Sequence, residues 1–107
     1  MPQSQILLVH ITCPADAAPA MAEALVRERL AACVNMLPGV RSVYLWEGRM
    51  EQAEETLLVA KTTQDRYPAL EAAVRRLHPY ELPEIVAVHV ARGLPAYLRW
   101  VEDSTTA

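Results

Sequence analysis

The sequence lacks most features that mark a special class of protein. It has only two cysteines, which form no C-x-x-C motif and are too few for the disulfide framework of a secreted protein. No apolar run approaches the ~20 residues of a membrane-spanning helix, so we expect no membrane insertion. Basic residues are scattered in a chain of net charge −3, so we expect no nucleic-acid partner. Neither a Gly-rich phosphate loop nor a nucleophile–base–orienter set occurs, so we expect a protein that is not an enzyme.

Composition predicts one folded domain over residues 1–107. Hydrophobic residues make up 52% and charged residues 21% of the chain, which excludes disorder as the main state. The first eleven residues lack the basic segment and cleavage site of a signal peptide. We therefore expect a cytoplasmic protein with reduced thiols.

Hydrophobic patterning predicts an α+β domain with the order βαββαβ and a C-terminal helix. The apolar stripe of Leu70, Ala73, Val74 and Leu77 indicates a helix that ends before Pro79. An earlier helix begins near Asp16 and Pro19 and buries Ala22, Leu25, Val26 and Leu30, while Thr63 or Asp65 caps the second helix. This order is the ferredoxin-like arrangement, with an antiparallel sheet. The predicted strands cover residues 6–11, 33–46, 50–62 and 85–90, and the other helices cover 16–32 and a segment from Pro95.

The second and third predicted strands form an unusually long hairpin. Pro38 interrupts the first arm, which predicts a strand at a sheet edge, and Gly48 supplies the positive φ of the turn. Neither face of residues 40–46 is cleanly polar, although a hairpin with one solvated face should alternate. An exposed aromatic edge strand is an aggregation hazard. We therefore expect other subunits to cover the hairpin.

The connection between the second helix and the last strand concentrates polar chemistry. His78, Tyr80 and Glu81 lie on a short segment that two prolines, Pro79 and Pro83, make rigid. One interpretation is structural: His78 sits at a helix C-terminus and Tyr80 packs. The alternative is a ligand site on this connection.

Candidate metal ligands are scattered and show no diagnostic spacing. Copper favours imidazole and sulfur ligands. Cys33 is expected to be a small buried residue, whereas Cys13, at a strand end, is expected to be more exposed. His10 and His89 lie on strands that should be antiparallel neighbours, and their Cα atoms would be about 7–8 Å apart if both face the same side. The potential ligands are His10, Cys13, Cys33, Met36, Met50, His78 and His89.

A set of short motifs resembles the CutA divalent-cation tolerance family along nearly the whole chain. The resemblance implies a ferredoxin-like fold and a homotrimer built through the long hairpins. It also implies a role in tolerance of copper and other divalent cations, with an architecture similar to that of trimeric PII signalling proteins. The matching residues are 28–35, Pro38, Ser42, Tyr44, Trp46, Gly48, Glu54, Lys61, Thr62, 78–81, 83–85 and 97–100.

The resemblance also bears on metal binding. The metal ligands proposed for some members fall here on Ile11, Leu77 and His78, and only the histidine can ligate copper. The metal candidates are therefore His78, Cys13 and Cys33, with weaker copper binding than in members that keep the whole set.

A second candidate site is a cleft between subunits, suited to a small anionic or amphipathic ligand. Three hypotheses follow: a trimeric metal-binding tolerance protein, a PII-like small-molecule sensor, and an assembly scaffold without a ligand. The residues expected to line the cleft are Tyr44, Trp46, Lys61, His78, Tyr80 and Glu81.

Overall fold

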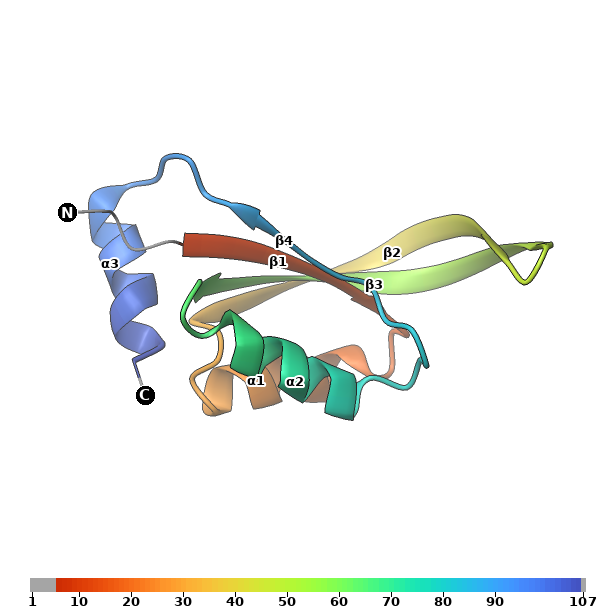
Figure 1. Cartoon of the computed structure of the whole chain (residues 1–107), viewed down its shortest axis with the longest axis horizontal. Coiled ribbons are helices and arrows are strands. Elements are labelled where there is room, and N and C mark those ends of the chain that lie inside the picture. The colour runs from red at the N-terminus through yellow and green to blue at the C-terminus, as the bar shows by residue number, and fades with distance from the viewer. Residues whose placement is uncertain (1–5, 107) are drawn as a thin grey trace.

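The computed structural model describes residues 6–106 and confirms the ferredoxin-like α+β class. Four strands form one sheet in the order β2-β3-β1-β4, and each neighbouring pair is antiparallel. Figure 1 shows α1 and α2 together on one face of this sheet and α3 at the end far from the hairpin tip. The elements are β1 (Ile6–Cys13), α1 (Ala18–Arg27), β2 (Cys33–Trp46), β3 (Arg49–Thr63), α2 (Tyr67–Leu77), β4 (Ile85–His89) and α3 (Pro95–Ser104).

The core lies between the sheet and the two helices. Val9 and Ile11 of β1 point toward the helices and are fully buried. Burial of each such side chain stabilises the folded state by about 1.5–3 kcal/mol. Leu8 and His10 alternate with them and are only half-buried on the opposite face. Among the helices of residues 6–106, only α3 reaches that opposite face, where its Val101 packs with Ile6 at the end far from the hairpin tip, so the face stays open beside the hairpin (Figure 1).

The hairpin of β2 and β3 projects beyond the rest of the sheet. The pairing of β1 with β3 ends at Cys13 and Thr56, so the stretch from Arg49 to Glu55 pairs only with β2. A register shift between Leu37 and Val40 accommodates Pro38 and Gly39, and β2 is an edge strand, as the proline predicted. Glu47 and Gly48, with φ of 52° and 80°, make the two-residue turn.

The first helix ends earlier than the sequence indicated. The predicted end near residue 32 is wrong, because Arg29 adopts φ 61° and its N–H bonds to the Val26 carbonyl at 3.0 Å. The Leu30 N–H bonds to the Leu25 carbonyl at 2.9 Å, which completes a Schellman motif. Leu30 is buried as expected, although it lies in the loop after the helix. Val26 was also expected to face the core, but it is 43% exposed.

The predicted helix caps are also wrong. Ala17 and Arg66 occupy the N-cap positions of α1 and α2, and neither makes a side-chain capping bond, so Asp16 and Asp65 do not cap. Thr63 accepts only the Arg66 N–H, at 3.3 Å, before the helix begins. A proline in the first turn fixes both starts instead. The predicted end of α2 before Pro79 is confirmed, although Leu77 is 41% exposed.

The two strand histidines do not meet. Register pairs Leu7 with His89 and His10 with Val86, so His89 shares the face of Leu7 and His10 lies on the other. The condition for a contact, that both histidines face the same side of the sheet, is therefore not met. Finally, none of the helices in residues 6–106 is long and apolar enough to cross a membrane.

Candidate ligand-binding site

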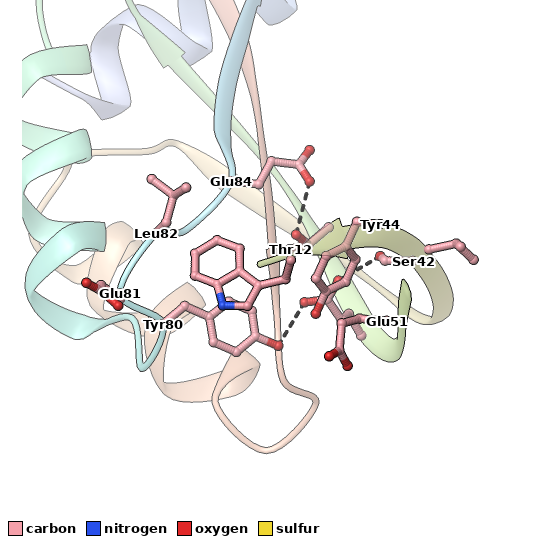
Figure 2. Close-up of a pocket in the computed structure, with 11 residues that line it drawn as sticks. Thr12, Ser42, Tyr44, Glu51, Tyr80, Glu81, Leu82 and Glu84 are labelled. Carbon is pink, nitrogen blue, oxygen red and sulfur yellow. Dashed lines mark hydrogen bonds between the residues drawn. The ribbon is translucent and has the colours of Figure 1, made fainter. Parts of the chain in front are cut away.

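A pocket of about 710 Å³ opens where the hairpin, the end of β1 and the connection after α2 meet (Figure 2). It lies on the sheet face that the helices leave open, because Ser42, Tyr44 and Trp46 alternate toward that face along β2. The connection from α2 forms the other wall. The lining residues are Thr12, Ser42, Val43, Tyr44, Trp46, Glu51, Glu55, Tyr80, Glu81, Leu82 and Glu84.

Glu55 joins the two walls of the pocket. Its side chain is 5% exposed and accepts two hydrogen bonds, from the Ser42 hydroxyl at 2.7 Å and from the Tyr80 hydroxyl at 2.9 Å. Bonds to an ionised carboxylate are short and about twice as strong as bonds between neutral groups. The carboxylate therefore holds the hairpin and the connection in one geometry.

Tyr80 keeps its proton at neutral pH. Burial, and then the hydrogen bond to Glu55, raise the pKa of the Tyr80 phenol to about 12. Nearby negative charge disfavours the phenolate, whereas the neutral phenol donates its hydrogen bond to the carboxylate. Tyr80 therefore adds an aromatic ring to the pocket but no charge, and its hydroxyl proton is already donated to Glu55.

His78 positions Tyr80 rather than lining the pocket. The Tyr80 N–H donates to His78 Nδ1 at 3.1 Å, so Nδ1 carries no proton and Nε2 donates to the Thr12 carbonyl at 2.8 Å. The two rings lie 4.8 Å apart between centroids. The Thr12 hydroxyl donates in turn to Glu84 at 3.1 Å (Figure 2). These bonds fix both ends of the connection that carries Tyr80, Glu81 and Leu82.

The lining carries a strong excess of negative charge. Its ionisable carboxylates are Glu51, Glu55, Glu81 and Glu84, and no lysine, arginine or histidine from residues 6–106 lines it. Such a lining attracts cations. We expected an anionic or amphipathic ligand, and the charge of this pocket favours a cationic ligand over an anionic one.

The structure brings together four of the predicted binding residues: Tyr44, Trp46, Tyr80 and Glu81. Lys61 is not among the lining residues, because it lies six positions along β3 from Glu55 and contacts Asn35 and Cys33 instead. The most buried polar residue of the site, Glu55, was missed. Glu54 and Glu55 are adjacent, and only strand register shows which one faces the pocket.

The predicted metal ligands do not converge within the chain. Cys13 pairs with Thr56 and Cys33 with Lys61, which are five positions, or roughly 17 Å, apart along β3, and the two cysteines lie on opposite faces. Both nitrogens of His78 are already hydrogen-bonded. No group of three or more histidine, cysteine, aspartate or glutamate residues within 6–106 is arranged to hold a metal ion. These residues therefore do not fit copper in one chain.

The two thiols also differ from expectation. Cys13 is fully buried, and burial, followed by the charges of Glu55 and Asp16, raises the pKa of its thiol. Cys33, expected to be buried, is half-exposed beside Lys61. A raised pKa and complete burial both oppose the thiolate that a copper ligand requires.

Comparison with known proteins gives the family. The model of the CutA1 divalent ion tolerance protein family matches residues 7–104. The chain belongs to this family. It is 48% identical over 99 residues to the divalent-cation tolerance protein CutA of Thermus thermophilus, covering 92% of this chain and 96% of that protein. It is 45% identical to the protein CutA of Mus musculus over 89% of this chain, but it spans only 54% of that longer protein.

Solved CutA structures share the fold over almost the whole chain. CutA from Xylella fastidiosa superposes with a TM-score of 0.93 at 42% identity, covering 96% of this chain and all of that one. CutA1 from Oryza sativa gives a TM-score of 0.93 at 38% identity, covering 96% and 95% of the two chains. The names of the family and of the Thermus thermophilus relative state a relation to divalent ions, and none of these names states an enzymatic reaction.

Proposed function

We propose that the chain acts as a homotrimer in the cellular response to divalent cations, and that it binds a cationic ligand in the pocket around Glu55. The observation that carries the proposal is the pocket itself, which combines a buried carboxylate with three further carboxylates and no basic side chain from the described residues. The family name supports the relation to divalent cations. The cytoplasmic location stays a prediction.

Unsatisfied surfaces of the single chain support the homotrimer. The outer edges of β2 and β4 make no strand pairs within residues 6–106. Val43, Leu45 and Met50 on the hairpin are 62–67% exposed, and Val86 and Val88 on the open face are 50–52% exposed. Contacts between different surfaces of identical chains form a ring when the rotation between copies closes, and in such a ring further copies would cover both the edges and the apolar side chains.

Copper bound by His78, Cys13 and Cys33 receives no support from the geometry of one chain. It would require a buried thiol and a histidine whose two nitrogens are engaged. The small-molecule sensor is the stronger alternative, because a 710 Å³ pocket with three aromatic side chains exceeds what a bare ion needs. The sensor hypothesis and the proposed cation site both place the ligand in the pocket around Glu55.

Complementation tests this function. A strain of the source organism that lacks the gene should grow poorly in excess divalent metal, and the wild-type gene should restore growth. Glu55→Gln should fail to restore it, because the amide removes the buried negative charge while it keeps the side-chain shape. The control is Glu54→Gln, an exposed position on the other side of the same strand. Full rescue by Glu55→Gln would show that the pocket has no part in tolerance.

A further inference from the structure

The Glu55 carboxylate is buried without a cationic partner. It is 5% exposed and forms no salt bridge with any residue from 6 to 106. Burial of a charge is costly unless the charge is paired. Ser42 and Tyr80 each supply one donor, whereas a carboxylate offers about four acceptor sites. Glu55 therefore keeps capacity for a donor that also carries positive charge.

The other carboxylates are distributed around the pocket rather than gathered at one point. Glu51 comes from the hairpin, Glu81 from the connection and Glu84 from the segment before β4. Within residues 6–106 no three acidic, cysteine or histidine side chains converge on a point that a metal ion would occupy. Separated negative charges match a ligand whose positive charges are themselves separated.

Between the carboxylates the lining is aromatic and aliphatic. Tyr44 and Trp46 come from β2 and Tyr80 from the connection, and Val43 and Leu82 add aliphatic surface. Figure 2 shows Tyr44 and Tyr80 on different parts of the chain around the cavity. Aromatic faces attract ammonium groups through their quadrupole, most strongly where water is excluded. A hydrated inorganic ion would gain nothing from this hydrocarbon surface, whereas an alkyl chain would bury against it.

From these observations we infer that the pocket binds a small organic dication, a short alkyl chain that carries two ammonium groups. One ammonium group binds at Glu55 between Ser42 and Tyr80, and the other lies toward the remaining carboxylates. The alkyl chain packs on the aromatic side chains. The inference rests on the proposed function, because it names the chemical class of the cation that the pocket receives.

Calorimetric titration of the purified protein at fixed ionic strength tests the inference. The probes are putrescine, which carries two ammonium groups, 1,4-butanediol, which has the same chain length and no charge, and MgCl₂, which has the same charge and no hydrocarbon. Putrescine should bind saturably, butanediol should not bind, and Mg²⁺ should bind at least about tenfold more weakly. These differences isolate the contributions of charge and of the alkyl chain.

Variants at three lining residues connect the binding to the pocket. Glu55→Gln should weaken putrescine binding at least about tenfold. If this variant does not fold, Glu51→Gln, at a half-buried position, tests the same loss of putrescine binding. Tyr44→Leu should weaken it several-fold through loss of the aromatic face. Glu54→Gln should bind as the wild type does, because that side chain is exposed outside the pocket.

The outcomes separate the inference from the proposed function. Equal binding of putrescine and Mg²⁺, lost in Glu55→Gln, would overturn the organic dication and leave the cation pocket standing. Equal binding of putrescine and butanediol would also overturn it, because charge would then be irrelevant. If no cation binds, or if Glu55→Gln binds putrescine as well as the wild type does, both proposals fail.

Discussion

At the scale of single residues, Glu55 joins parts of the chain that are far apart in sequence. Ser42 on β2 and Tyr80 after α2 both donate to it, and His78 fixes the backbone of Tyr80. Loss of one donor leaves a buried carboxylate less satisfied, and hydrogen bonds to charged groups contribute about 1.5–3 kcal/mol. The network therefore stabilises the fold and shapes the pocket with the same atoms.

Tyr80→Phe should lower the free energy of unfolding by about 1 kcal/mol at pH 7, below that range because the Tyr80 side chain is 38% exposed and water can replace its hydroxyl. The effect should depend on pH. The folded pKa of about 12 lies above the ordinary value of 10, so the contribution of the phenol is complete below pH 10 and declines as the pH rises toward 12.

Urea unfolding of the wild type and Tyr80→Phe between pH 7 and 12 measures this contribution. The difference in stability between the two proteins should shrink above pH 10, and the other tyrosines cancel in the comparison. A difference that stays constant up to pH 12 would contradict the hydrogen bond between Tyr80 and Glu55.

At the scale of secondary structure, local sequence predicted element order better than element ends. Pro38, Gly48 and Pro79 act through their own backbone restrictions, and the bulge, the turn and the end of α2 occur where these residues predicted them. The end of α1 was missed because Arg29 adopts a positive φ that its residue type does not announce. The positive φ of Arg29 accompanies the burial of Leu30, the next residue, in the core, and this burial depends on tertiary contacts.

Arginine-to-glycine substitutions at the two sides of this helix end should have opposite signs. Arg29→Gly should raise the free energy of unfolding by about 0.5–1 kcal/mol, because the left-handed conformation costs an ordinary residue roughly 1–2 kcal/mol and glycine repays part of this in chain entropy. Arg27→Gly should lower it by about 1 kcal/mol, since Arg27 is the last helical residue. Denaturant unfolding measures both, and destabilisation by Arg29→Gly would contradict the Schellman geometry.

For the candidate site too, the residues that local sequence marks were predicted, and those that depend on tertiary pairing were not. Tyr44, Trp46, Tyr80 and Glu81 were predicted because rigid or aromatic segments are visible in the sequence. Glu55 depends on a register between strands, and the absence of Lys61 from the lining depends on its distance along β3. Pairing between distant segments fixes both, and local pattern does not contain it.

At the scale of the whole molecule, the single chain is elongated and incompletely covered. Its dimensions are 48 × 26 × 22 Å, and the hairpin extends away from the helices (Figure 1). Exposed apolar side chains on the hairpin and on the open sheet face would cause aggregation if they stayed uncovered. The proposed association of three identical chains would account for the length of the hairpin and for the two unpaired strand edges together.

The native mass in solution tests this account most directly. Light scattering on the eluting peak of a sizing column, at micromolar concentration, should give about three times the 11.9 kDa chain mass. Leu45→Glu, at a hairpin position that is 67% exposed in the single chain and outside the pocket, should shift the mass toward the single chain, because a charge buried without a partner in an interface costs several kcal/mol. A wild-type mass near 11.9 kDa would contradict the account, because the apolar hairpin and the sheet edges would then have no partner.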